Sequence, residues 1–328
     1  MLWEGAVAAL VFAVILVNGW TDAPNAIAAC VATGALPMKK AVALAAAGNL
    51  AGVWVSVCLG GGVTRTVLEL AAFGEGPRAL AGLCAGMGAV VLWAVGAWRW
   101  GIPTSESHAL TGGLAGAAVA LEGFSALRPG PWLVVLAGTA GSLAAGGLGG
   151  WGAARLLDRC FPKGRRGEKA FFRRSQIAGA AAMAFLHGAQ DGQKFLGVLL
   201  LAGSHGGGKP PDSPLPVVLC ALLMALGTAM GGGRIVRTVG QQMVRLDGKQ
   251  GFAADLAGIL CLGVSTGLGA PVSTTHAKTA AILGAAAAGG GERVNWRIAG
   301  EMVLAWVLTL PGCALLGWLL ARWLAAPL

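Results

Sequence analysis

The sequence predicts an all-α polytopic membrane protein built from two inverted repeats of about five hydrophobic segments each. Three observations lead to this fold class. Of the 328 residues, 56% are hydrophobic and 12% are charged, whereas an ordinary soluble domain carries roughly 25% charged residues. Apolar runs of about 20 residues, each long enough to cross a bilayer, recur along the whole chain. Polar motifs of the first half return in the second half at a spacing of 168 or 169 residues.

The hydrophobic segments number ten and pair one to one between the two halves. They cover residues 3–34, 41–62, 79–98, 102–121 and 131–155, then 176–203, 215–233, 251–268, 270–290 and 297–325. Because each copy has an odd number of segments, the second copy must enter the membrane from the opposite side. The short segments 102–121 and 270–290 either span the membrane or re-enter it as hairpins, and both alternatives stay open at this point.

These segments divide the chain into three parts. We expect a first transmembrane repeat at 1–157, a basic cytoplasmic linker at 158–174 and a second transmembrane repeat at 175–328. The first segment lacks a basic region before its apolar run, so we expect no cleavable signal peptide. The seven cysteines show no CxxC spacing and six lie in apolar runs, so we assign them neither a disulfide nor a metal.

Basic side chains divide unequally between the two faces of this arrangement. With the N-terminus outside, seventeen Lys and Arg residues fall on the inner face, five fall on the outer face, and Lys194 and Lys278 lie within the membrane. Because cytoplasmic loops are enriched in Lys and Arg, the bias predicts a multi-pass plasma-membrane protein (an inner-membrane protein in a bacterium) with both termini outside. The net charge of +10 therefore reflects contact with the lipid bilayer, and we expect no nucleic-acid partner.

The first pair of polar motifs interrupts the opening segment of each half. Residues 18–25 read NGWTDAPN and residues 187–194 read HGAQDGQK, which aligns Asp22 with Asp191 and Asn25 with Lys194. Gly and Pro weaken helical hydrogen bonding, and freed backbone groups at membrane depth need a polar cavity. We therefore predict a broken helix in both copies. The paired aspartates predict a coupling-ion or proton site, although a buried aspartate can also pair with a lysine or cap a half-helix.

The second pair of motifs is rich in hydroxyl groups. Residues 101–108 read GIPTSESH and residues 269–276 read GAPVSTTH. Proline suits the first turn of a helix, so each motif is expected to begin a helix at its proline. Hydroxyls and free N–H groups at a helix N-terminus bind anions. Two such ends meeting across a pseudo-two-fold axis would hold a tetrahedral oxyanion from both sides, whereas in the alternative interpretation the hydroxyls only cap helices.

Duplicated interrupted segments with buried polar groups are typical of the midplane site of a secondary transporter. An intramembrane hydrolase is the alternative from another class, because Ser105 and His108 lie three residues apart. A third catalytic group and an oxyanion hole are not identifiable in the sequence. We therefore predict that the chain is not an enzyme, and we expect His108 and His276 to be structural.

These motifs resemble those of the PiT family of inorganic phosphate transporters. The second motif is a close match to the family's GxPVSTTH pattern, and AWVLTLPG, from Ala305 to Gly312, resembles the final span. The resemblance implies symport of phosphate with Na⁺ or H⁺ and a homodimer, with a bound Na⁺ as the only cofactor-like group. Carried over by position, the coupling-ion residues are Thr21, Asp22, Asn25 and Asp191. The substrate residues would be Ser105, Glu106, Ser107, Ser273, Thr274, Thr275, Gln190 and Lys194.

Several positions depart from the family pattern. Thr21 and Gln190 replace the asparagine before each aspartate, Glu106 replaces a threonine, and Lys194 replaces the second asparagine. An ammonium only donates hydrogen bonds and cannot coordinate a cation. Lys194 either stands in for one coupling cation or pairs with Glu106. The first alternative predicts fewer bound cations than in Na⁺-coupled relatives, with Na⁺ retained at Asp22 and protons as a driving ion.

Sulfate is the alternative substrate within the same fold. Sulfate carries no proton at neutral pH and offers only acceptors, whereas phosphate also offers a donor. A carboxylate beside the anion, from Glu106, Asp22 or Asp191, would accept that proton and repel sulfate. The sequence therefore favours phosphate.

Overall fold

The computed structural model describes residues 2–56, 61–162, 167–205 and 214–328, and its regular structure is helical. The first repeat contains α1 (Leu2–Thr21), η1 (Ala23–Ile27), α2 (Ala28–Ala32), α3 (Met38–Ser56), α4 (Gly62–Leu68), α5 (Gly76–Arg99), α6 (Glu106–Glu122), η3 (Phe124–Ala126) and α7 (Pro129–Cys160). The second contains α8 (Glu168–His205), α9 (Leu215–Gly231), α10 (Gly233–Arg237), η4 (Thr238–Gln242), α11 (Gly248–Gly267), α12 (Thr274–Ala288), η5 (Gly291–Arg293) and α13 (Trp296–Leu324).

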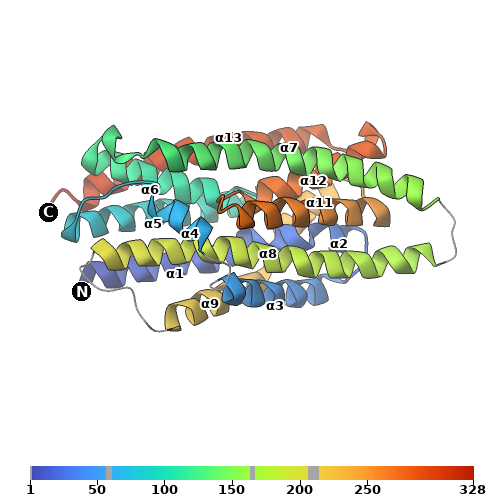
Figure 1. Ribbon diagram of the computed structural model, residues 1–328, viewed down its shortest axis with the longest axis horizontal. Coiled ribbons are helices and arrows are strands. Elements are labelled where there is room, and N and C mark those ends of the chain that lie inside the picture. Colours follow the sequence, from blue (N-terminus) through green and yellow to red (C-terminus); the bar gives the residue numbers. More distant parts are fainter. Residues whose placement is uncertain (1, 57–60, 163–166, 206–213) are drawn as a thin grey trace.

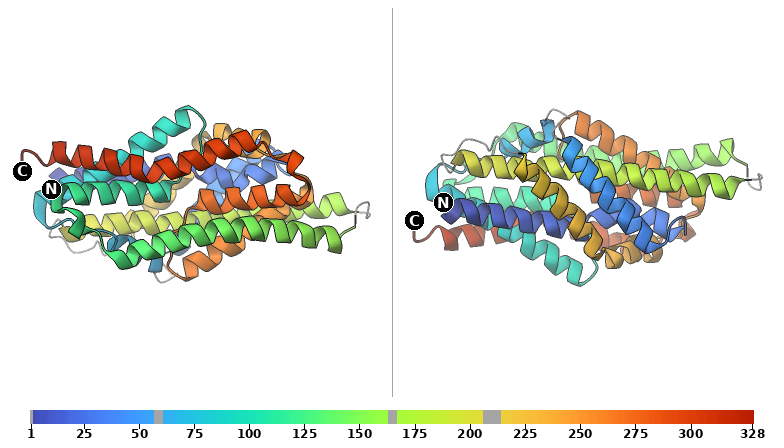
Figure 2. Two further views of the ribbon diagram at one scale, coloured as in Figure 1. Left: turned by 90° about the horizontal axis from the view of Figure 1, so that it is seen from above. Right: turned by 90° about the horizontal axis from the view of Figure 1, so that it is seen from below.

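The helices pack lengthwise into one elongated bundle. Both chain ends lie at one end of the bundle, whereas α7 ends and α8 begins at the other end (Figure 1). The long helices α7 and α8 run along most of the bundle in both further views (Figure 2). Among the described residues, four helical stretches are long and apolar enough to cross a membrane, at Leu2–Ala32, Gly76–Arg99, Pro129–Cys160 and Trp296–Leu324, and α9 with α10 and η4 forms a fifth candidate bent by 57°.

Two helical hairpins enter the bundle from opposite ends. The first hairpin consists of α5 and α6, and an isolated β-bridge between Ala71, before α5, and Leu127, after α6, closes its open end. The second hairpin consists of α11 and α12, and a bridge between Val244 and Val294 closes it in the same way. In Figure 1, α5 and α6 occupy the half that holds the chain ends, and α11 and α12 lie toward the other half.

The second helix of each hairpin is too short to cross a bilayer. Helix α6 has 17 residues and α12 has 15. At 1.5 Å per residue they measure about 25 Å and about 22 Å, against roughly 30 Å for the hydrocarbon core. Of the two alternatives for segments 102–121 and 270–290, the structure therefore supports re-entrant hairpins.

The hairpin tips meet inside the bundle. The Ser107 hydroxyl donates to the Val272 carbonyl at 3.0 Å. The rings of His108 and His276 meet edge to face with their centroids 4.6 Å apart. The N-termini of α6 and α12 therefore face one another, which fits two inverted repeats related by a pseudo-two-fold axis.

The predicted break in the second repeat is wrong. Helix α1 ends at Thr21 and a 3₁₀ turn follows, but α8 continues through residues 187–194. The difference lies in Pro24, which has no N–H and whose ring would clash with the preceding turn. The equivalent position is Gln193, and the glycines that remain cost only about 1 kcal/mol each in a helix. Gly188 and Gly192 instead lie against the backbone of α3.

The predicted helix starts at the prolines are also wrong. Helix α6 begins at Glu106 and α12 at Thr274, so Pro103 and Pro271 lie in the approach to each helix rather than in its first turn. The serines decide the start, because Ser105 and Ser273 are the N-caps and their hydroxyls accept from the N–H groups of His108 and His276. Such caps satisfy donors that have no partner within the helix.

Candidate functional site

A buried polar cluster occupies the point where α1 stops, α8 passes and the two hairpin tips meet. The proline after Asp22 ends α1 and places this carboxylate at the N-terminus of α12. Thr274 Oγ1 donates to Asp22 Oδ2 at 2.9 Å, and the Thr275 hydroxyl donates to Oδ1. Asn25 Nδ2 lies 2.9 Å from Asp22 Oδ1 and 3.1 Å from Thr275 Oγ1. All four side chains are at least 98% buried.

A second carboxylate, Asp191, lies on the continuous helix α8. Its Oδ1 is 2.6 Å from Lys194 Nζ, and its Oδ2 accepts from Asn18 Nδ2 at 2.9 Å. Lys194 Nζ also donates to Ser107 Oγ at 2.5 Å and to the Val272 carbonyl at 2.8 Å. The lysine therefore contacts its own helix and both hairpin tips, and its three donors are all used.

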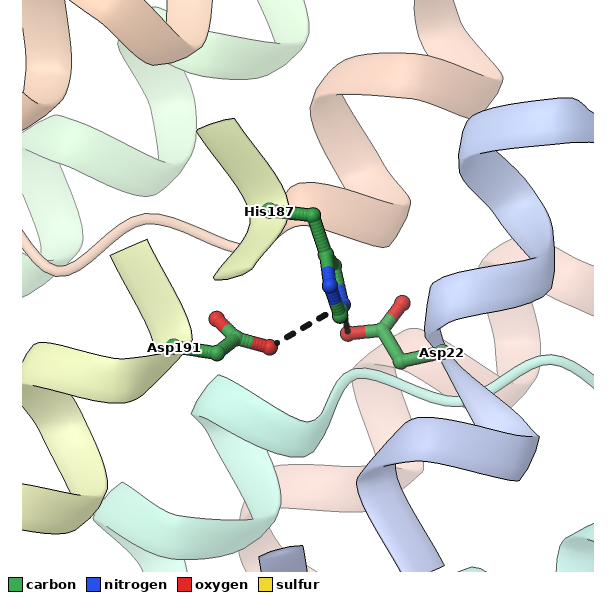
Figure 3. A group of neighbouring side chains, drawn as sticks. All are labelled: Asp22, His187 and Asp191. Atoms are coloured by element: carbon green, nitrogen blue, oxygen red, sulfur yellow. Dashed lines mark ion pairs between the residues drawn. The ribbon is translucent and has the colours of Figure 1, made fainter. Parts of the chain in front are cut away.

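His187 lies between the two aspartates, with its imidazole directed toward both (Figure 3). Its Nε2 is 3.2 Å from Asp191 Oδ2 and 3.8 Å from Asp22 Oδ2. Its Nδ1 is 2.9 Å from Asn49 Oδ1. These contacts bring two carboxylates and one imidazole together in one site, and their oxygen and nitrogen atoms lie within 4.8 Å of one another.

The hydrogen bonds around His187 also assign its protons. Thr228 donates its hydroxyl to the Met224 carbonyl at 2.8 Å, so it accepts from Asn49 Nδ2 at 3.0 Å. The Asn49 oxygen then faces Nδ1, which must carry a proton. Nε2 lies 3.2 Å from Asp191 Oδ2 and 3.8 Å from Asp22 Oδ2 but makes no hydrogen bond among the described residues, so the hydrogen bonds assign a proton to Nδ1 alone.

Glu106 does not pair with Lys194, and that alternative is wrong in this structure. The carboxylate accepts from Thr21 Oγ1 at 2.9 Å through Oε1, while Oε2 has no hydrogen-bond partner among the described residues. Lys194 pairs with Asp191 instead, since the two are three residues apart on α8. Glu106 is 2% exposed, so a carboxylate with an unused oxygen is held beside the hairpin tip.

The remaining predicted residues lie around this cluster. Ser105 and Ser273 direct their oxygens to the caps of α6 and α12. Gln190 donates to the Ala270 carbonyl at 3.0 Å and accepts from Thr266 at 3.3 Å, so it supports the approach to the second hairpin. The structure brings all twelve predicted site residues to the tips or to their immediate support. Their division into substrate and coupling-ion residues remains a prediction.

Sequence reasoning missed several buried polar residues. His187 is the first residue of the motif HGAQDGQK but was assigned no role, and Asn18 was noted only as the first residue of the motif NGWTDAPN. Asn49 is the single polar residue of the apolar stretch 41–55 and gave no signal. Asp255 was detectable as a lone carboxylate within an apolar segment, and it forms an ion pair with Lys278 that is fully buried on both sides.

Inverted repeats, a broken helix and facing hairpin tips around buried ionisable groups define a secondary transporter. Residues 18–168 and 161–317 each match the phosphate transporter family. The chain therefore belongs to this family, which confirms the predicted resemblance and the prediction of a membrane transporter rather than an enzyme.

Similar proteins come from several bacteria and share the description "probable low-affinity inorganic phosphate transporter". One from Mycobacterium tuberculosis H37Rv is 36% identical over 312 residues, which cover 92% of this chain and 72% of the relative. One from Bacillus subtilis is 33% identical over 305 residues, covering 92% and 91% of the two chains. A relative from Rhizobium meliloti is 36% identical, covering 91% and 90%.

A solved structure described as "The sodium-dependent phosphate transporter" superimposes with a TM-score of 0.89 over the full length of both chains. At 20% sequence identity, this likeness concerns the fold. It confirms the all-helical fold class with repeated halves.

Proposed function

We propose that this chain carries inorganic phosphate across the plasma membrane in symport with a small cation, Na⁺ or H⁺. The observation that carries the proposal is the meeting of two helix N-termini beside two repeat-related aspartates. A helix N-terminus favours an anion, and a carboxylate favours a cation. Their combination in one buried site suits a cation and an oxyanion moving together.

The anion side of the proposed site consists of the first turns of α6 and α12. The backbone N–H groups of these turns have no partner within the helix, and the side chains of Ser107, Thr274 and Thr275 add hydroxyl donors. Two of these hydroxyls already hold a carboxylate, that of Asp22. The same donors would hold a phosphate oxygen equally well, since both groups are oxyanions.

The cation side of the proposed site consists of oxygen atoms around Asp22. Besides the carboxylate and the two threonine hydroxyls, Asn25 contributes an Oδ1 that is buried without a hydrogen-bond partner among the described residues. The end of α1 adds the carbonyl groups of a helix C-terminus, which serve as cation ligands in broken transporter helices. This set fits Na⁺ by its chemistry, and a proton on the carboxylate would serve a proton-coupled cycle.

Phosphate is favoured over sulfate by the carboxylates beside the hairpin tips. The unused Oε2 of Glu106 can accept the proton that phosphate carries and sulfate lacks. A buried acceptor facing a ligand without a donor would stay unsatisfied, which costs about 1–3 kcal/mol. That penalty corresponds to a preference of about 5- to 150-fold for phosphate.

Uptake into proteoliposomes tests the proposal. Labelled phosphate and labelled sulfate are compared under an imposed Na⁺ gradient and, separately, under an imposed pH gradient. We expect accumulation of phosphate driven by at least one of the gradients, and little accumulation of sulfate. Asp22→Asn is the matched control, since it keeps the shape of the side chain and removes the charge. Equal uptake by this variant, or a preference for sulfate, would reject the proposed site.

The proposal includes the orientation and the assembly of the protein. We place both termini outside, because the basic residues then lie mainly on the cytoplasmic face, and we propose a homodimer. An apolar groove of about 680 Å³ between α7 and α11 is lined by small residues such as Gly138, Gly141 and Gly149, and small residues allow helices to approach closely in lipid. The mass of the intact complex, measured by native mass spectrometry, tests the dimer.

A further inference from the structure

The first of two similar triads lies at the tip of the second hairpin. Asn25 Nδ2 donates to the Asp22 carboxylate at 2.9 Å and contacts the Thr275 hydroxyl at 3.1 Å. Asn25 and Asp22 come from the first repeat, whereas Thr275 comes from the hairpin of the second. An amide nitrogen thus bridges a carboxylate and a hydroxyl across the repeat interface.

The second triad repeats this pattern at the tip of the first hairpin. Lys194 Nζ donates to the Asp191 carboxylate at 2.6 Å and to the Ser107 hydroxyl at 2.5 Å. Lys194 and Asp191 come from the second repeat, whereas Ser107 comes from the hairpin of the first. Each hairpin therefore supplies a hydroxyl to the triad of the other repeat.

The two triads occupy equivalent positions of the duplicated sequence. The carboxylates are 169 residues apart, the bridging nitrogens are also 169 apart, and the hydroxyls are 168 apart. The two triads differ in the bridging group. An asparagine amide is neutral and has an oxygen that can bind a cation, whereas an ammonium is positive and has no atom that can bind one. Within the part of the chain that the structure describes, Asn25 Oδ1 has no hydrogen-bond partner, while the donors of Lys194 are used on Asp191, Ser107 and the Val272 carbonyl.

We propose that the Lys194 ammonium is a tethered cation that fills the second cation position of the site. The inference rests on the proposed function, in which the first triad takes up a free cation. Lys194 is surrounded by three oxygens at 2.5–2.8 Å from three different segments, which is the environment that a free cation would need. The lysine thus sets the number of co-transported cations, and it joins α8 to both hairpin tips without an inorganic ion.

The charges around the ammonium support this assignment. Asp191 on α8 and Asp22 at the start of η1 face His187, Glu106 lies at the start of α6, and all of these side chains are buried. An uncompensated carboxylate in this setting would be costly. Removal of the ammonium therefore leaves the second triad in need of a cation from solution.

Lys194→Asn tests the inference, because it makes the second triad a copy of the first. The full chain is purified in detergent without phosphate, and bound ²²Na⁺ is counted by equilibrium dialysis. We expect the variant to bind one Na⁺ per chain more than the unaltered protein. Its melting temperature should also rise more on exchange of choline chloride for NaCl, since ligands that bind the folded state stabilise it. Adding Asp191→Asn should remove both gains.

A folded Lys194→Asn variant that binds no more Na⁺ than the unaltered chain would overturn the inference. Lys194→Gln is measured in parallel, because its longer amide reaches further toward Ser107. Failure of both variants to fold in NaCl would also count against a tethered cation, since Na⁺ should then replace the ammonium. Sodium counts are independent of transport, so a chain that carries no phosphate would refute the proposed function and leave this measurement valid.

Discussion

The buried ion pair between α11 and α12 allows a quantitative test of the second hairpin. Lys278 Nζ contacts Asp255 Oδ1, and both side chains are 0% exposed. Lys278→Met removes the ammonium with little change in volume and leaves the carboxylate buried without its counter-ion. A Cβ added at Gly179 would lie 2.8 Å from Asp255 Oδ2, so α8 closes this side of the pair. Breaking a buried pair of this kind costs about 3–5 kcal/mol.

A double variant separates the loss of the pair from the loss of packing. Lys278→Met with Asp255→Ala removes both charges, and replacing a buried pair by apolar groups is often neutral or stabilising. The first repeat shows that an apolar residue fits at this position of the fold, because the residue equivalent to Lys278 is Leu110, which lies in an apolar core. We expect the double variant to regain about 2 kcal/mol or more of the stability that the single variant loses.

Equilibrium unfolding in detergent, followed by tryptophan fluorescence, measures these free energies. Lys40→Met is the control, since Lys40 is exposed on α3 and surface substitutions usually change stability by at most about 0.5 kcal/mol. A loss below about 1 kcal/mol for Lys278→Met, or a double variant less stable than the single one, would refute the reasoning.

Three further predictions concern the site, the packing and the topology. Thr274→Val should weaken phosphate binding about tenfold or more, because a hydrogen bond to a charged group is worth about 1.5–3 kcal/mol; unchanged affinity would leave Thr274 only its hydrogen bond to Asp22. Gly188→Ala should destabilise the protein by about 1–3 kcal/mol, because the added Cβ would lie 2.4 Å from the Asn49 carbonyl oxygen, whereas Gly152→Ala within α7 has open space and should stabilise the protein by up to about 1 kcal/mol. Cysteines placed in loops 158–174 and 234–250 should be labelled from the same side of the membrane; labelling from opposite sides would end the inverted-repeat topology.

The two helix starts at the hairpin tips could be predicted to within a few residues because their signal is local, although the sequence left open whether these segments span the membrane or re-enter it. A proline followed by a serine marks the approach to a helix and its N-cap, and the pattern occurs at Ser105 and again at Ser273. The break in the second repeat could not be predicted from glycine alone. A glycine such as Gly188 lowers the stability of a helix by only about 1 kcal/mol. Close packing of this residue against α3 favours a continuous α8 here.

The sequence could predict which residues meet in the buried cluster, but it could not predict their partners. Duplication singled out Asp22 and Asp191, since both copies retain the carboxylate. The contact between Asp22 and Thr275 joins residues 253 apart, and no periodicity encodes such a distance. The partner predicted for Lys194 illustrates the limit: the sequence suggested Glu106, whereas the unbroken helix α8 places Asp191 one helical turn away from the ammonium.

The charge of the buried cluster gives a physical reason for coupling, and this leads to the last prediction. If all of these groups are ionised, the buried site holds three carboxylates, those of Asp22, Asp191 and Glu106, against two cations, His187 and Lys194. The cluster is then negative before an anion enters, and isolated charge at this depth is costly. A phosphate ion should therefore enter only with at least one added cation or proton. In choline medium with an inward phosphate gradient, we expect any remaining proteoliposome uptake of phosphate to be accompanied by proton uptake, measured with a pH-sensitive dye inside the vesicles. Phosphate uptake in choline without proton movement would show that the site neutralises the anion by itself, and coupling through Asp22 would have to be abandoned.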